Sequence, residues 1–482
     1  MSRTLLLIFI CAAVQPAIAQ QRRATDVAKT SERETARRDD ESLALLREAA
    51  DLLQAGRRDE AESLIRRALL IAPKNADAHN LLGIVLDQSG RTKEAEREYQ
   101  EALRLNPRAA SARANLGILL ARTGRSAEAI QAFEAVLREV PDHPQALFNL
   151  GLQYGARGDY SRAAGLFERL NQLRPHAFEV LYNLGTTLYQ LKRFDEAAAA
   201  LLSAATLAQT APEPLYYLGL IAAARGQSEA AVEYWRKALA LRAEFAAASF
   251  MIGEELSKQL RYAEAAEFYE RALKQDPAKL VYYVRLGGVY MLLVRFDQAL
   301  EVFQRAEENF PDAAEAHYFA GVAARGRGSF EVAEAAFRKA IALQPDNADA
   351  LAQLGYIVGE HSNYAEAEQL LRRAIALADK HFYAHYDLGR LLVKTRRYRE
   401  AIPILQRGVS LCADNAGVHY QLFLAFTRLK QKEEADREET LFKALEEERK
   451  RRRGGDDACR ADAPVAPPAA IPPAPSGVNP AP

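Results

Sequence analysis

A glycine recurs every 34 residues through most of this 482-residue chain. An alanine keeps a second fixed position in the same register, from Ala61 to Ala435, in all twelve successive units of residues 42–449. A fixed period of this length indicates one supersecondary unit repeated along the chain, not several unlike domains. The ten glycines that keep the spacing are Gly83, Gly117, Gly151, Gly185, Gly219, Gly253, Gly287, Gly321, Gly355 and Gly389.

Each unit has the pattern of two helices. In the fourth unit, Leu147 and Leu150 lie on one helical face because they are three residues apart. Gly158 ends this first helix, and the second helix carries Phe167 on its buried face and ends before Pro175. One helix pair cannot bury both of its apolar faces, so neighbouring units must stack around a continuous core. The sequence therefore predicts an all-α solenoid.

This pattern resembles the tetratricopeptide repeat, whose 34-residue signature places Leu-Gly, Tyr, Ala, Phe and Pro at these offsets. The resemblance implies a right-handed α-solenoid of about twelve helix-turn-helix repeats, with the first helix of each repeat on the concave surface. The match weakens at both ends. Glu48 and Ala49 replace the Leu-Gly pair in the first unit, and Phe423 and Glu439 replace the glycine and the aromatic in the last. Atypical polar ends are expected of capping repeats.

Residues 1–19 have the pattern of a secretory signal peptide. Arg3 precedes an apolar stretch that runs to Val14, and Ala17-Ile18-Ala19 forms a small-x-small cleavage site. The apolar stretch is shorter than the roughly twenty residues that a membrane-spanning helix needs, which disfavours an uncleaved anchor. The sequence predicts export, to the periplasm or cell envelope or into the medium, with no membrane span in the mature chain.

The segments flanking the repeats are unlike the repeats in composition. Residues 20–41 form a charged leader, expected to be disordered or partly helical. Residues 450–482 comprise a basic helix end and a Pro/Ala-rich tail, which cannot bury a core and is expected to be disordered. Pro464-x-x-Pro467 and Pro472-x-x-Pro475 match the spacing of ligands for polyproline-binding grooves, and a plain flexible spacer is the alternative.

Composition and motifs exclude several classes of function. Lys and Arg total 64 and Asp and Glu total 64, a balance that disfavours nucleic-acid binding through general electrostatics. The sequence contains no G-x-x-x-x-G-K, G-x-S-x-G, H-E-x-x-H or C-x-x-C motif. We therefore expect no catalytic residues and no cofactor.

Histidines and cysteines raise two further questions. His381, His385 and His419 are spaced so that they approach one another in a stacked array, as metal ligands do. Other units carry a histidine at the same repeat position without such companions, which favours packing over a metal site. Cys412 and Cys459 form an even pair in the mature chain. The sequence leaves open both a disulfide that ties the tail to the eleventh unit and two free thiols.

The resemblance also suggests a peptide-binding groove centred on residues 110–245. An asparagine ladder can hydrogen-bond the backbone of an extended peptide while aromatic side chains hold its side chains. Tyr and Asn are also the family consensus at these two positions, so a purely structural role is the alternative. The candidates are Phe148, Tyr182, Tyr216 and Phe250 at the fifth repeat position and Asn115, Asn149 and Asn183 at the sixth.

These features together predict a non-catalytic scaffold that binds a protein or peptide partner, with the oligomeric state left open. Similar exported arrays suggest an envelope assembly or exopolysaccharide-export factor as an alternative. A regulatory subunit of an enzyme carried on a separate chain is an alternative of another class. A partner with an acidic C-terminal tail is not indicated, because Asn80, Ile84, Gln145 and Asn149 stand around Asn115 where a basic clamp would be needed.

Overall fold

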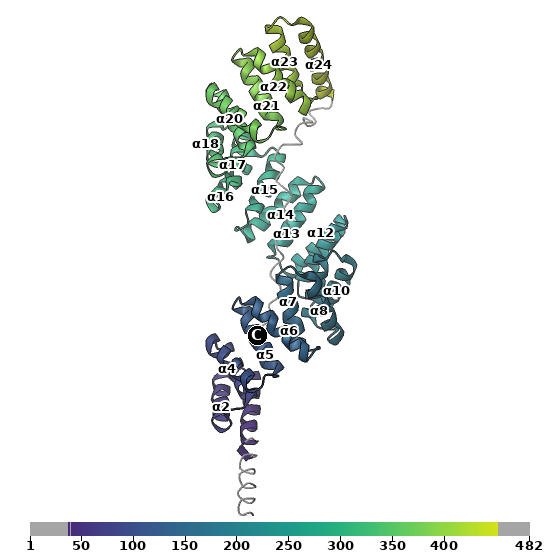
Figure 1. Ribbon diagram of the computed structural model, residues 1–482. Helices are drawn as coiled ribbons and strands as arrows, with labels where there is room; N and C mark the ends of the chain where they lie inside the picture. Colours follow the sequence, from purple (N-terminus) through teal and green to yellow (C-terminus); the bar gives the residue numbers. More distant parts are fainter. Residues whose placement is uncertain (1–36, 39, 452–482) are drawn as a thin grey trace, which may run out of the picture. The chain divides into compact units, whose positions relative to one another are not determined.

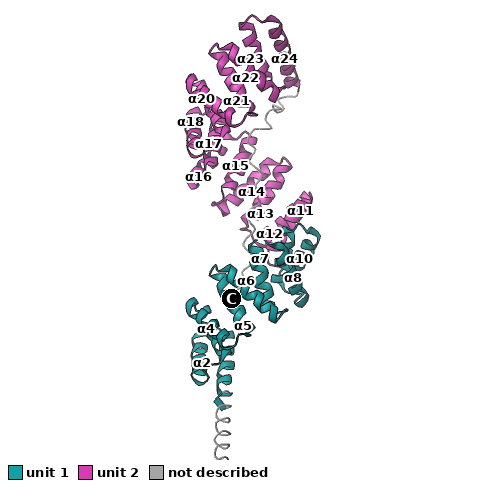
Figure 2. Ribbon diagram, in the orientation of Figure 1, with its two compact units in different colours: residues 1–209, 477–482 teal, residues 210–476 magenta. Residues whose placement is uncertain are grey.

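The computed structural model describes residues 37, 38 and 40–451, and within 40–451 it contains helices and no strand. The described chain forms two compact units, one ending at Gln209 and the other beginning at Thr210 (Figure 2). The predicted signal peptide, most of the charged leader and the Pro/Ala-rich tail lie outside the described residues.

In the first unit, residues 40–54 are helical and precede nine further helices. These are α2 (Arg58–Ile71), α3 (Ala76–Gln88), α4 (Thr92–Leu105), α5 (Ala110–Arg122), α6 (Ser126–Glu139), α7 (Pro144–Ala156), α8 (Tyr160–Leu173), α9 (Phe178–Gln190) and α10 (Phe194–Leu207).

The second unit continues the same alternation of helices. Its helices are α11 (Glu213–Ala224), α12 (Ser228–Leu241), α13 (Ala246–Lys258), α14 (Tyr262–Gln275), α15 (Leu280–Leu292), α16 (Phe296–Asn309), α17 (Ala314–Arg327), α18 (Phe330–Leu343), α19 (Ala348–Glu360), α20 (Tyr364–Leu377), α21 (Phe382–Lys394), α22 (Tyr398–Leu411), α23 (Ala416–Arg428) and α24 (Lys432–Arg451).

The helices pair in the register that the sequence predicts (Figure 1). Each odd-numbered helix from α3 on is the first helix of a repeat and packs against the even-numbered helix that follows it. Each second helix then packs against the first helix of the next repeat in the same unit, as α4 packs against α5 and α14 against α15. Both units are therefore stacks of helix pairs, and the all-α solenoid prediction is confirmed.

The recurrent glycine is the point of closest approach within a pair. A Cβ atom built on Gly151 would lie 2.8 Å from two ring carbons of Phe167, and the other nine glycines of the series face the equivalent side chain of their own repeat in the same way. Real side chains do not tolerate contacts this short, so only glycine lets the two helices approach around a large side chain. The recurrent alanine of each second helix is also buried, with exposed fractions of 0–5%.

The turn between the two helices of a repeat always contains one residue with positive φ. Glycine supplies it in six repeats, as at Gly226, where φ is 72°. The other six repeats use Lys192, Leu260, Val294, Ser362, Arg396 and Lys430, with φ between 58° and 65°. A β-branched residue such as Val294 is strained in this left-handed conformation. The sequence predicted the six turns that contain glycine. The six turns without glycine carry no such signal, and they adopt positive φ because the stacked repeats require the same turn.

Replacing Val294 with glycine should stabilise its own helix pair by about 1 kcal/mol, because relief of left-handed strain exceeds the entropic cost of glycine. Val294 is 71% exposed, so little packing is lost. Hydrogen exchange of α15 and α16 measures the change.

The matched control is Gly226→Ala. A Cβ on Gly226 meets nothing within 4 Å, so this substitution changes only the backbone preference and should cost about 1 kcal/mol. Equal effects of the two substitutions, in the same direction, would show that the turn is not strained.

Candidate functional site

The first helices form the more closely packed layer of each unit. In the first unit α3 contacts α5, α5 contacts α7 and α7 contacts α9, and in the second unit α15 contacts α17, α19 contacts α21 and α21 contacts α23. Close packing of these helices places them on the inner side of each stack. We call the surface of these odd-numbered helices the first-helix face.

The predicted asparagines belong to this face, and their side chains have different hydrogen-bond partners. The side-chain nitrogen of Asn115 donates to Oδ1 of Asn80 at 3.0 Å, and Gln145 donates to Oδ1 of Asn115 at 3.4 Å, which links three successive repeats. Asn149 and Asn183 instead donate to carbonyl oxygens of their own helices. The structure therefore brings Asn115 into a cross-repeat network. Asn149 and Asn183 each use one N–H of the side-chain amide within their own helix, and Asn183 is 8% exposed.

The predicted aromatic residues are mostly buried. Phe250 is 0% exposed between Tyr269 and Tyr282, whose ring centroids lie 5.6 and 4.8 Å away. Tyr216 is 0% exposed and Tyr182 is 1% exposed. Three rings expected to line a groove thus have almost no exposed surface, which supports the structural alternative for them.

Phe148 is the half-buried member of the predicted set. Its ring meets that of Phe167 edge-on at 6.0 Å, and it packs against the small core cluster around Leu147 and Val180. A peptide-groove role for Phe148 and the three asparagines stays a prediction.

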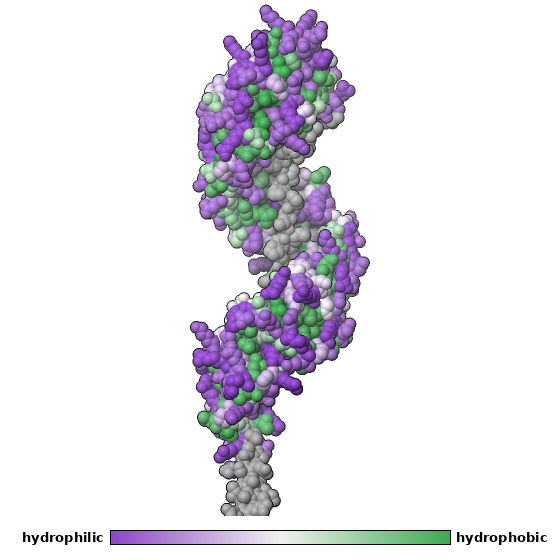
Figure 3. Space-filling model, in the orientation of Figure 1, coloured by the Kyte–Doolittle hydropathy of each residue, from purple (hydrophilic) through white to green (hydrophobic). Residues whose placement is uncertain are grey.

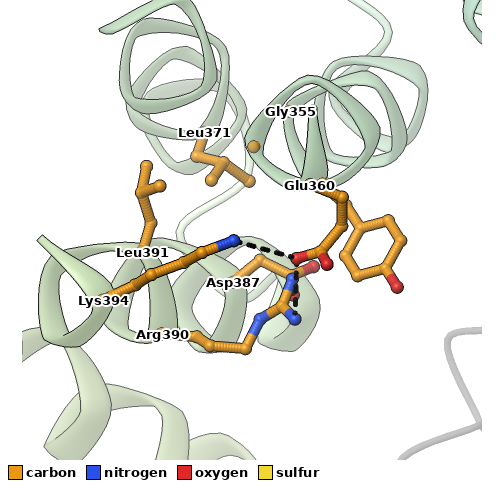
Figure 4. Close-up of a pocket in the computed structure, with 9 residues that line it drawn as sticks. Gly355, Glu360, Leu371, Asp387, Arg390, Leu391 and Lys394 are labelled. Carbon is orange, nitrogen blue, oxygen red and sulfur yellow. Dashed lines mark ion pairs between the residues drawn. The ribbon is translucent and has the colours of Figure 1, made fainter. Parts of the chain in front are cut away.

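A charged cluster that the sequence did not single out lies on α19 and α21 (Figure 4). The guanidinium of Arg390 lies 3.1 Å from a carboxylate oxygen of Glu360 and 3.5 Å from one of Asp387. The Nζ of Lys394 lies 4.0 Å from the same oxygen of Glu360. These side chains, together with Tyr356, line a small surface pocket on the first-helix face.

The ring of Tyr356 contacts one arginine from each of the two neighbouring repeats. The guanidinium carbon of Arg390 lies 4.8 Å from the centroid of its ring, and that of Arg325 on α17 lies 5.2 Å away. Arg325 also donates to the side chain of Gln353 on α19. Cation–π contacts hold the two arginines and the ring as one polar and aromatic surface across three repeats.

Asp387 is the buried member of the cluster. Burial raises the pKa of Asp387 to about 6, against the smaller opposing effects of Arg390, Arg325 and His381. Glu360 acts in the same direction as burial. The nearest cation is 3.5 Å away, too far for a strong hydrogen bond, so the ionised carboxylate is poorly compensated.

A second polar cluster lies on α13 and α15. The Nε of Arg285 lies 2.9 Å from Oε1 of Glu254, and the hydroxyl of Tyr269 donates to the same oxygen at 2.5 Å. Burial is the main cause of the raised pKa of Tyr269, followed by the charge of Glu254. Glu254 and Arg285 belong to the first-helix face, and Tyr269 belongs to the second helix α14.

One sequence signal marks both clusters. The ninth position of the repeat is apolar in several repeats, as at Ile84, Ile118 and Leu152. It holds Glu254, Tyr356 and Arg390 in three repeats of the second unit. A polar residue that replaces an apolar one at a fixed repeat position is the pattern that would have found them.

The three histidines considered as metal ligands have separate partners. His381 accepts from the backbone N–H of Ala384 and lies 3.0 Å from Asp349. His385 bonds to the carbonyl oxygen of Asp379, and His419 lies 2.6 Å from Glu438. Among the described residues, no three His, Cys, Asp or Glu side chains converge as metal ligands do.

The remaining sequence questions concern the membrane and the cysteines. No helix among residues 40–451 has the length and apolar character needed to cross a bilayer. Cys412 is disulfide-bonded, and Cys459 lies outside the described residues. Pairing of Cys412 with Cys459 stays a prediction at this point.

Family models described as "Tetratricopeptide repeat" match most of the described chain. One matches residues 85–144, 148–212, 216–279 and 293–351, and two others match residues 40–108 and 360–419. The chain belongs to the tetratricopeptide repeat family. Proteins of this family bind protein partners, and their fold is typically non-catalytic, so this chain is a protein-interaction scaffold.

None of the curated proteins compared with the chain matches it. Among solved structures, the chain is similar to pilF of Pseudomonas aeruginosa, with 25% identity, 42% of this chain and 93% of that chain covered, and a TM-score of 0.40. MamA shows 25% identity over 33% of this chain and 94% of that chain, with a TM-score of 0.32. Yeast Tom70 shows 18% identity over 89% and 98%, with a TM-score of 0.34. All three are loose superpositions, and the family assignment does not depend on them.

Replacing Asp387 with Asn should change how stability depends on pH. Burial raises the pKa of Asp387 in the folded chain to about 6, from an ordinary value of 3.8. The folded chain therefore binds a proton more tightly than the unfolded chain between these values, and its stability falls as pH rises through that window. The variant cannot titrate there, so its stability relative to the parent should rise by up to about 3 kcal/mol between pH 4 and pH 7.

Denaturant titrations at several pH values measure this difference, read locally by hydrogen exchange of α21. The control is Asp414→Asn, at an exposed position in the turn before α23. A pH-independent difference between the Asp387 variant and the parent would contradict the account of this carboxyl group.

Proposed function

We propose that this protein is an exported, non-catalytic scaffold of the cell envelope that binds a protein partner through its first-helix face. Family membership supports the protein partner, and the predicted signal peptide supports export. The periplasm is the proposed site of action.

The observation that carries the proposal is the surface formed by Arg325, Tyr356 and Arg390. Tyrosine and arginine are, with tryptophan, enriched among the residues that dominate binding energy at protein interfaces. Here they stand on three successive first helices, where one partner segment can contact all of them. Figure 3 shows one side of the chain, on which hydrophilic residues predominate and apolar ones form smaller areas.

The first unit has a polar network on its own first-helix face that can serve the same role. Asn80, Asn115 and Gln145 join three successive first helices through side-chain hydrogen bonds. Each unit thus presents polar groups on its first-helix face, where an extended protein segment can bind.

Site-specific photocrosslinking in the native host tests this proposal. A photoreactive residue replaces Arg325 on α17 in one variant and Lys339 on α18 in the other, because both positions are exposed and belong to the same repeat. The proposal predicts a discrete protein adduct from position 325 and none from position 339.

Adding Tyr356→Ala to the first variant should reduce the yield of that adduct at least about tenfold, since a central aromatic residue contributes about 2 kcal/mol or more at such interfaces. Adducts of equal yield from both positions, or a yield that Tyr356→Ala leaves unchanged, would place the binding surface elsewhere.

A further inference from the structure

The C-terminal repeats carry an aromatic surface beside a disulfide-bonded cysteine. Cys412 follows α22 directly, is 9% exposed and packs in one cluster with Phe382, Tyr383 and Tyr386 of α21. Cys412 is disulfide-bonded. The chain has only two other cysteines, Cys11 and Cys459, and both lie outside the described residues.

The aromatic side chains continue from α21 onto α23. The hydroxyl of Tyr386 lies against Gly417 in the first turn of α23, where a Cβ atom would approach it to 2.8 Å. Tyr420, one turn further along α23, is 38% exposed and has the ring of Phe423 at 6.3 Å. We call the surface of Tyr383, Tyr386, Tyr420 and Phe423 the C-terminal aromatic surface.

The chain's own tail has the chemistry that aromatic surfaces bind. Six prolines fall between Pro464 and Pro475, and proline-rich segments in the polyproline II conformation dock on grooves lined by aromatic side chains. Such segments lose little conformational entropy on binding, because they are already extended. The aromatic surface and the tail are therefore complementary.

Cys459 lies between the end of α24 and the proline-rich segment of the tail. Cys412 follows the end of α22, and α24, the next second helix, ends at Arg451. The eight residues from Arg451 to Cys459 span at most about 28 Å when extended. Pro464 follows Cys459 by five residues, about 15 Å in the polyproline II conformation. A Cys412–Cys459 disulfide thus holds the first prolines within reach of Tyr383 and Tyr386.

We propose that the Pro/Ala-rich tail is an intramolecular ligand: a disulfide between Cys412 and Cys459 tethers it, and residues 464–475 dock on the C-terminal aromatic surface. Cys11 is not the partner in the mature chain, because it belongs to the predicted signal peptide. Docking of the tail is independent of partner binding at the surface formed by Arg325, Tyr356 and Arg390.

The bond forms by ordinary thiol–disulfide exchange. The two thiols lose two protons and two electrons as the sulfur–sulfur bond forms, and a disulfide oxidant such as oxidised glutathione accepts them and is released as two thiols. An oxidising compartment outside the cytosol, which the signal peptide predicts, supplies oxidants of this class.

Peptide mapping of the full chain under non-reducing conditions tests the tether. The proposal predicts a Cys412–Cys459 crosslink in the monomer, and Cys459→Ser should leave the Cys412 thiol open to alkylation. Free thiols at both positions in the oxidised protein, or a crosslink only between two copies of the chain, would overturn the intramolecular tether.

Competition with a synthetic peptide of residues 460–476 tests the docking. In a full-chain variant with the six prolines of residues 464–475 changed to Ala, the surface is open, and the labelled peptide should bind. The oxidised parent should bind the peptide on the order of tenfold more weakly, because a tethered segment at millimolar effective concentration competes with it. Equal affinity in the two proteins would overturn the docking.

Two tyrosine substitutions locate the docking site in the proline-to-alanine background. Tyr420→Ala on α23 and Tyr383→Ala on α21 should each weaken peptide binding at least about fivefold, since aromatic platforms supply most of the affinity for such ligands. The control is Tyr398→Ala on α22, which should leave binding unchanged. An affinity insensitive to both Tyr420 and Tyr383 would contradict the assigned surface even with the tether in place.

Discussion

The structure depends on one steric contact made in ten of its repeats. A glycine in the first helix faces a large side chain of the second helix, so closely that a Cβ atom on Gly151 would reach within 2.8 Å of the ring of Phe167. The missing side chain brings the two helix axes together, and the ring fills the space that remains. Alanines on the second helix, buried in every repeat, let the pair pack at that distance.

This contact also determines where functional side chains can come together on the surface. The pairs stack in a constant register within each unit, so equivalent positions of neighbouring repeats align, and first helices such as α19 and α21 contact one another. Substitutions at one position then build a surface without altering the stack. Tyr356 and Arg390 both stand at the ninth position of their repeats, and that alignment puts the guanidinium 4.8 Å from the ring.

The sequence predicted the fold well because its strongest signal, a glycine every 34 residues, is the packing contact itself. It predicted the surface poorly because a repeat consensus does not separate packing from exposure. Phe250 and Tyr216 are 0% exposed, although they share a repeat position with Tyr420, which is 38% exposed. The cluster of Asp387, Arg390 and Glu360 could be found only by comparing repeats, since each charge is unremarkable alone. The positive φ of Val294 could not be predicted from its residue type either, because the stacked repeats impose the turn on whichever residue occupies that position.

The most direct test of this account is a double-mutant cycle at Gly287 and Phe303, read by hydrogen exchange of α15 and α16. Gly287→Ala should cost about 1–3 kcal/mol alone, because its Cβ would overlap the ring of Phe303, and nearly nothing once Phe303→Ala has removed the ring. Gly288→Ala, whose Cβ meets nothing within 4 Å, should not destabilise either background. A cost for Gly287→Ala that is the same with and without the ring would contradict the central claim.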